Sequence, residues 1–248
     1  LELNLQHGEE RPVDYNAIDN LVEVYNDIEK NKYFTVKEYA TNTNKTEGDV
    51  KKMLKKANLM VEFLSFINAE GKYYVARDME LDGPLQEVML ILNKEKDEEE
   101  HERVKNALFT AMTLSKDGDL TRYIRRIGKE IIQAGNREQF LDEYDDIVED
   151  VYDAYQEEAS VTVNTVKKLN ENLKNVREEA SSIVSKRVDE TVLTRVKMKP
   201  IDSLNTVIRT LDNVDADQIA RMDAGSKKEF ARLVEQIRKE LGAYESRL

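Results

Sequence analysis

The feature that most constrains this chain is the stretch 136–199, in which 64 consecutive residues include neither glycine nor proline. Because these two residues are the strongest helix breakers, so long a stretch without them indicates long helices. Strand signals are scarce. The best of them, 72–76 (KYYVA), is open to two interpretations, a turn of helix or a small strand. The sequence therefore predicts an all-α fold.

The composition excludes several classes of chemistry. The chain has no cysteine, so disulfides, thiolate catalysis and sulfur-ligated metals are excluded. Its two histidines, His7 and His101, are far apart in sequence, which argues against a histidine-built metal site or a Ser-His-Asp triad. The phosphate-binding motif G-x-x-x-x-G-K-[ST] does not occur. We therefore expect a protein that is not an enzyme and that uses neither a cofactor nor a metal.

The charge and hydropathy patterns are those of a soluble protein. Charged residues make up 35% of the 248, and the net charge is −12, which indicates much solvated surface per residue. The longest apolar run, 88–92, is too short to span a bilayer, and no signal peptide opens the chain. We expect a cytoplasmic protein without a membrane partner. Because the sequence begins with Leu1 rather than Met, we also expect that an upstream part is missing.

Changes in pattern along the chain predict four parts. Residues 1–95 form a linker helix and a helix-turn-helix DNA-binding domain, and 96–137 form a helical extension. Residues 138–199 form an acidic helix followed by coiled-coil-like helices, and 200–248 form a C-terminal helical oligomerisation module. The finer predictions are a helix over 13–32 capped by Asp14, short helices over 33–94 broken at 42–44, 68–71 and 82–84, and helices over 98–113 and 119–134 joined by a turn at 115–118.

The most informative stretch, 35–60, has the spacing of a helix-turn-helix. Such a motif needs a small residue where its two helices cross, and Ala40 fits. Four positions later it needs a residue that tolerates the left-handed conformation, and Asn44 is such a residue. Thr46 can cap the second helix, and Val50 supplies the inward β-branched residue ten positions after the alanine. The next core positions are predicted at Met53, Leu54 and Ala57.

The remaining positions of the second helix predict a DNA-binding face. Residues 31–60 have seven lysines against three acids, a net charge of +4 inside a chain of −12. A locally basic helix matters because phosphate neutralisation dominates affinity for nucleic acid. The alternative is a merely solvated lysine face, and Glu47 and Asp49 at the front of the helix would repel phosphates. The predicted DNA-binding residues are Lys37, Lys45, Thr46, Glu47, Gly48, Lys51, Lys52 and Lys55.

Together these residues resemble the ParB-type chromosome and plasmid partition proteins and their nucleoid-occlusion relatives. Asn44-Lys45-Thr46, followed by Val50 and Leu54, matches the family's Gly-Lys-Ser, Val and Leu pattern, with Asn in place of Gly. Leu3-Asn4-Leu5-Gln6 and the helix 14–30 are similar to the family's entry into this domain. The segments AnLMvEFLsFI (57–67), GKYYvAR (71–77) and ELDGPLQE (80–87) resemble a subgroup from firmicute bacteria and their mobile elements.

The resemblance covers roughly residues 1–95 and implies a function in plasmid or chromosome segregation. It implies double-stranded DNA as a partner, self-association as a homodimer or higher oligomer, a partition ATPase as a candidate partner, and a nucleoid- or plasmid-associated location. The family's N-terminal nucleotide-binding domain has no counterpart in this sequence, so no nucleotide-dependent clamp is assigned. The alternatives are a non-catalytic helical interaction scaffold and a transcriptional regulator that uses the helix-turn-helix fold.

Two further basic clusters are candidates for additional phosphate contacts. The first combines Lys72 and Arg77 with two tyrosines, and local packing explains it equally well. The second lies on one helix face, where positions i, i+3, i+4 and i+7 coincide. For this second cluster we favour a solvated flank that pairs with the acidic helix 138–158. Its members are Arg122, Arg125, Arg126 and Lys129.

The C-terminal half predicts an acidic helix, a short coiled-coil seam and a pairing module. Residues 138–160 contain ten acids and no Lys or Arg beside an apolar stripe of period 3.6, so their paired carboxylates indicate a solvated face rather than a metal site. After Pro200 we expect a new helix, and then a last helix opened by a Ser226–Glu229 capping box. The seam positions are Val166, Leu169, Leu173, Val176, Ala180 and Ile183.

Overall fold

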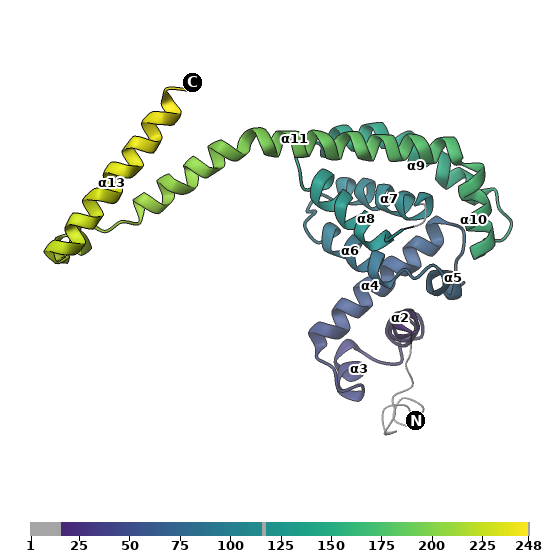
Figure 1. Ribbon diagram of the computed structural model, residues 1–248. Coiled ribbons are helices and arrows are strands. Elements are labelled where there is room, and N and C mark those ends of the chain that lie inside the picture. The colour runs from purple at the N-terminus through teal and green to yellow at the C-terminus, as the bar shows by residue number, and fades with distance from the viewer. Residues whose placement is uncertain (1–15, 116–117, 248) are drawn as a thin grey trace. The chain divides into compact units, whose positions relative to one another are not determined.

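The computed structural model describes residues 16–115 and 118–247, and every regular element in them is helical (Figure 1). The all-α prediction is confirmed, and the ambiguous run 72–76 is resolved as helix, because α5 covers most of it. The predicted segment 3–6 and the predicted cap Asp14 lie outside the described residues. The elements are α2 (Ala17–Tyr25), the π-helical η1 (Asn26–Lys30), α3 (Val36–Asn42), α4 (Glu47–Phe66), α5 (Tyr73–Asp78), α6 (Asp82–Leu92), α7 (Glu98–Leu114), α8 (Leu120–Ile127), the π-helical η2 (Gly128–Ile132), α9 (Arg137–Gln156), α10 (Val163–Asn172), α11 (Lys174–Asp212), α12 (Ala216–Arg221) and α13 (Ala224–Glu245).

The chain divides into two compact units, residues 1–193 and 194–248, called here the N-terminal unit and the C-terminal unit. Helix α11 contributes its first half to the N-terminal unit and the rest to the C-terminal unit. In the described part of the chain, no helix is both long enough and apolar enough to cross a membrane.

One apolar core holds the N-terminal unit together. Its buried side chains come from α2 through the first half of α11, and aromatic contacts join its layers. Phe109 of α7 meets Phe63 of α4 edge to face, with ring centroids 5.4 Å apart, and Phe66 at 5.8 Å. Burial therefore changes along α4: most of 57–66 is buried in this core, whereas 51–56 is exposed or half-buried. The C-terminal half of α4 anchors a helix whose N-terminal half is exposed or half-buried apart from Val50.

The acidic helix was correctly predicted. Helix α9 buries the predicted apolar stripe, in which only Val148 is half-buried, and exposes most of its carboxylates. Two of these carboxylates bind Arg103 of α7, at 3.0 Å from Asp142 and 2.7 Å from Asp145. The long stretch without a breaker thus forms helices because one face of each has a core to cover.

The predicted coiled-coil seam is interior and interrupted. Helix α10 ends at Asn172 and α11 begins at Lys174, with a change of backbone direction at Leu173 (ψ 26°). The seam residues are buried or half-buried in the core of the N-terminal unit. They therefore pack within the chain, where the heptad pattern alone suggested a coiled coil.

Two predicted helix boundaries in the C-terminal half are wrong. Pro200 lies inside α11 instead of ending it. The carbonyl that it leaves without a partner belongs to Val196, which is 64% exposed, so water can satisfy that carbonyl. The last helix begins at Ala224, two residues before the predicted cap Ser226. Its cap is Asp223, whose carboxylate accepts hydrogen bonds from the backbone of Gly225 at 2.8 Å and of Ser226 at 2.9 Å.

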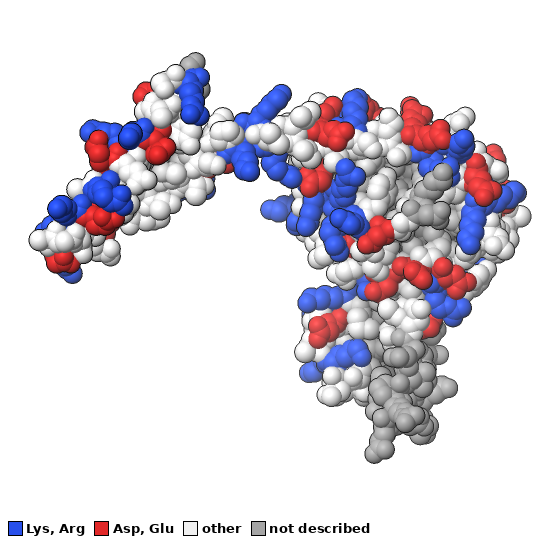
Figure 2. Space-filling model, viewed as in Figure 1, with Lys and Arg blue, Asp and Glu red and all other residues white. Residues whose placement is uncertain are grey.

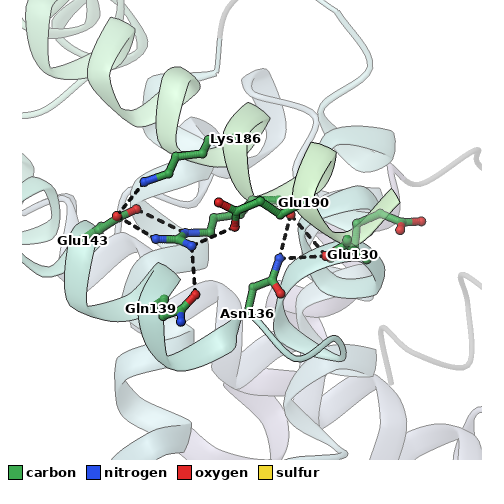
Figure 3. A network of polar contacts seen from close by, with 8 residues as sticks. Glu130, Asn136, Gln139, Glu143, Lys186 and Glu190 are labelled. Atoms are coloured by element: carbon green, nitrogen blue, oxygen red, sulfur yellow. Dashed lines mark hydrogen bonds and ion pairs between the residues drawn. The ribbon is translucent and has the colours of Figure 1, made fainter. Parts of the chain in front are cut away.

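A polar network holds the first half of α11 against α9 (Figure 3). Its centre is Arg187, whose side chain is only 8% exposed. The Arg187 guanidinium lies 2.6 Å from Glu143 and donates to Gln139 at 2.9 Å and to Glu190 at 2.8 Å. Hydrogen bonds from Lys186 and from Arg187 lower the pKa of the Glu143 carboxyl. A lowered folded-state pKa means that this stabilisation is present at neutral pH and is lost as the pH falls through it.

Arg187→Met is therefore expected to destabilise the N-terminal unit by about 2–3 kcal/mol, because it leaves partly buried acceptors without their donor. Urea denaturation at pH 7 measures the change. Lys186→Met is the matched control: Lys186 also bonds Glu143, at 3.0 Å, but its side chain is 53% exposed. We expect the control to cost less than about 0.5 kcal/mol. Equal, small changes in the two variants would contradict a structural role for the buried network.

Candidate nucleic-acid interface

Helices α3 and α4 are joined by the four-residue turn 43–46, and the predicted local features are all present. Ala40 is buried where the helices meet, and Asn44 has the expected left-handed conformation (φ 55°). Thr46 caps α4: its hydroxyl accepts from the Asp49 backbone at 3.1 Å. Val50 is fully buried. These four residues fix the angle between the two helices because each satisfies a local requirement of a tight turn.

The start of α3 carries a feature that our sequence analysis missed. Thr35 and Glu38 form a reciprocal capping box: the Thr35 backbone donates to the Glu38 carboxylate at 2.8 Å, and the Glu38 backbone donates to the Thr35 hydroxyl at 3.3 Å. The signal was in the sequence, as the T-x-x-E pattern of 35–38. This cap holds the first helix of the pair, and Tyr39 buries its ring behind the turn.

The exposed face of α4 is basic and largely unpaired. Lys51 and Lys52 are exposed, as is Lys45 in the turn, and none of these three makes a hydrogen bond or ion pair through its side chain within the described residues. Lys37 on α3 is likewise exposed and unpaired within the same residues. Glu47 and Gly48 share the exposed front of α4. The structure thus leaves these predicted positions of α3 and α4 exposed.

The other lysines of α4 have partners inside the chain. The Lys55 ammonium donates to the Asn93 side chain at the end of α6, although Lys55 remains exposed. Lys56 has a side chain only 14% exposed and pairs with Asp82 at 2.5 Å. Met53 and Leu54, predicted as core, are half-buried.

Gly48 is not required by the fold. A Cβ at this position would meet only the Thr46 hydroxyl, at an ordinary contact distance of 3.7 Å. Glycine nevertheless destabilises a helix by up to about 1 kcal/mol relative to alanine. A side-chain-free position on the exposed front of α4 allows another backbone to approach closely.

Several predicted site residues have hydrogen-bond or ion-pair partners within the chain. The Thr46 hydroxyl is fully used in the cap, since it also donates to the Asp49 carboxylate at 2.7 Å. Lys72 donates to the Ser160 hydroxyl at 2.8 Å and to the Val161 carbonyl at 3.2 Å. Arg77 lies within 4 Å of carboxylates of α2 and of its own helix. Lys72 and Arg77 thus have partners within the chain, which agrees with the local-packing interpretation, and we leave both out of the interface.

The basic face of α8 does not pair with the acidic helix, and that prediction is wrong. Arg125 instead binds Glu87 of α6, with distances of 2.7 and 3.0 Å. Arg122, Arg126 and Lys129 are exposed and have no ion-pair partner in residues 16–115 and 118–247. The carboxylates of α9 find their partners on α7 and α11, which sequence spacing alone could not indicate.

Comparison with known protein families, with curated proteins and with solved structures found no match for this chain. The resemblance of residues 1–95 to partition proteins therefore stays a prediction from the sequence.

Proposed function

We propose that this protein binds duplex DNA through α3 and α4, used as a helix-turn-helix, and that it is not an enzyme. The observation that carries the proposal is the set of exposed, unpaired lysines at the front of a firmly anchored helix: Lys45, Lys51 and Lys52. In helix-turn-helix proteins the N-terminal residues of the second helix contact base edges in the major groove. Lysines at the N-terminal end of α4 would therefore lie beside the major groove and the phosphates that flank it.

Two features refine the proposed contact. Gly48 gives the DNA close access to the α4 backbone, which explains a glycine that the fold does not need. Glu47 faces the same side and repels phosphates, which favours a base contact or weak overall affinity over tight non-specific binding.

A salt series with the full chain tests the proposal. Each phosphate contact contributes about 0.9 to the slope of log affinity against log salt. Four lysines (Lys45, Lys51, Lys52 and Lys55) contribute roughly −3 to −4 to this slope, so we expect the slope of the full chain to be at least this steep. Fluorescence anisotropy with a labelled duplex of mixed sequence, between 50 and 200 mM salt, measures it. Absence of binding at 50 mM salt would contradict the proposal.

We further propose that the C-terminal unit mediates self-association. No described residue of 194–247 is buried, so this unit lacks a core of its own. An apolar groove of about 780 Å³ runs between α13 and the last part of α11. The unit has eleven Lys and Arg against nine Asp and Glu, whereas the rest of the chain has 27 against 41. Two copies of this nearly neutral unit attract through apolar surface without strong repulsion. The main groove residues are Pro200, Leu204, Val207, Leu233, Ile237, Leu241 and Tyr244.

Leu204→Glu is expected to weaken self-association at least about 100-fold, since it places a charge in the apolar groove. Sedimentation velocity of the full chain over a concentration series measures the change. Asn205→Glu is the matched control, because Asn205 is exposed on the same helix and does not line the groove. An unaltered chain that sediments as a 28.7 kDa monomer at all concentrations would contradict the proposed self-association.

The partition role rests on the sequence resemblance alone, and we propose it together with a nucleoid- or plasmid-associated location and a partition ATPase as partner. The rival function is an interaction scaffold, which the exposed apolar groove of the C-terminal unit favours. DNA binding separates the two: a scaffold that retains only the helix-turn-helix shape binds no duplex. A transcriptional regulator would share the DNA contact and differ only in the site that it binds.

A further inference from the structure

The basic face of α8 is rigidly connected to α4 through one helix, α6. From one side, α4 contacts both ends of α6: Lys56 pairs with Asp82 in its first turn, and Lys55 bonds Asn93 at its end. Apolar packing between α4 and α6 adds to these contacts in the common core. The position of α6 relative to the lysine face of α4 is therefore fixed at two points.

From the other side, α8 and η2 contact both ends of α6 through glycines. A Cβ on Gly83 would lie 2.5 Å from the Thr121 hydroxyl, and a Cβ on Gly128 would lie 2.5 Å from the Ile91 side chain. Real side chains do not approach so closely, so a Cβ at either position would force the neighbouring side chain to shift, and glycine allows α8 and η2 to pack closely against α6. Helix α6 therefore lies between α4 and α8 and holds both.

This arrangement sets the distance between the two basic faces. Packed helices lie about 8–10 Å apart, so two such steps place the α8 axis within about 20 Å of α4. A major groove is about 12 Å wide and is flanked by phosphate backbones on both sides. A helix two packing steps from one that enters the groove lies within reach of a flanking backbone.

The charge on this side of the molecule suits that contact. Figure 2 shows Lys and Arg side chains gathered over α6 and α8, on the same face as lysines over α4. Lys94 lies between them, and its ammonium donates to Gln133, just after η2, at 2.9 Å. The nearby carboxylate of Glu87 is neutralised by Arg125. Arg122, Arg126 and Lys129 therefore keep uncompensated positive charge at the surface.

We propose that Arg122, Arg126 and Lys129 bind phosphates of the same duplex that α4 enters, beside the groove. This inference rests on the proposed DNA binding by α3 and α4 and extends its footprint across α6. The contact positions the duplex and adds affinity without reading its sequence, because phosphates carry no sequence information.

The test compares two triple variants of the full chain. One changes Arg122, Arg126 and Lys129 to Ala. The matched control changes three exposed lysines of α10 and the start of α11, Lys167, Lys168 and Lys174, and so removes the same charge. Binding of a labelled 20-base-pair duplex of mixed sequence is measured between 50 and 200 mM salt, and circular dichroism melting verifies the fold of each.

The α8 variant is expected to flatten the salt slope by up to about 2.7, so that the loss of affinity over this salt range shrinks roughly 40-fold. The control is expected to change the slope by less than about 0.5. Equal slopes in the two triple variants would overturn this inference. If Lys51→Glu with Lys52→Glu still weakens binding about 100-fold or more, the proposed DNA binding by α3 and α4 stands. If none of these variants alters binding, the proposed function itself fails. If the α8 variant binds DNA as the unaltered chain does but no longer binds an acidic protein, the basic face of α8 binds protein and this inference is overturned.

Discussion

Changing Lys51 and Lys52 together to Glu is expected to weaken duplex binding about 100-fold or more at 100 mM salt. Both side chains are exposed and unpaired in the described structure. Replacing them therefore removes no interaction within the described residues, and the expected loss is that of contacts with DNA. Each reversal removes one phosphate contact and adds a repulsion, which changes the salt slope by up to about 1.8 per site. Anisotropy titration with the same labelled duplex measures the affinity.

The matched control is Lys167→Glu with Lys168→Glu on α10, which makes the same change in net charge at two exposed positions. We expect at most a few-fold loss, from the long-range field of the protein. Both double variants are expected to melt within about 2 °C of the unaltered chain. Similar losses from the two variants would mean that α4 has no special role and that its lysines form only a solvated face.

Val50→Lys is the second change with a large expected effect, and it acts on stability. Val50 is fully buried in the apolar core where α3 meets α4. Burying an unpaired charge there is expected to cost at least about 3 kcal/mol, so α3 and the first half of α4 lose their fixed arrangement. Thermal and urea denaturation followed by circular dichroism measure the loss, and DNA binding falls with it.

Val50→Ala separates packing from charge at the same position. It removes two methyl groups without adding polarity and is expected to cost roughly 2 kcal/mol or less. The fold, and with it most of the DNA affinity, is then retained. A Val50→Lys protein that melts like the Val50→Ala protein would show that position 50 is not part of the contact between the two helices.

The local features of α3, α4 and α9 were predictable because each depends on residues close in sequence. The left-handed turn needs only a tolerant residue, and Asn44 is one. The cap of α4 needs an oxygen one residue before the helix, and Thr46 supplies it. The stripe of α9 needs only the 3.6-residue period. The folded structure keeps these local conformations because they are compatible with the packing of the core.

Apart from the two helix boundaries at Pro200 and Ser226, the difficulties concern contacts between residues far apart in the chain. Sequence spacing placed the α8 arginines beside the acidic helix, whereas Arg125 pairs with Glu87, 38 residues earlier. For Lys72 the sequence left a phosphate contact and local packing equally open, and only the fold shows its bonds to residues 160–161. The close packing of Gly128 on Ile91 also has no local signature. In each case the deciding partner is set by tertiary packing, which a pattern along one helix does not contain.

DNA binding by α3 and α4 is tested most directly by amide hydrogen exchange of the full chain, measured with and without a saturating 20-base-pair duplex. The first backbone N–H groups of α4, at Glu47 and Gly48, precede the residues that can bond back within the helix, so they exchange fast in the free protein. We expect bound DNA to slow exchange at the 43–46 turn and in the first turn of α4. Bound duplex that leaves the exchange of residues 36–55 unchanged would contradict this expectation.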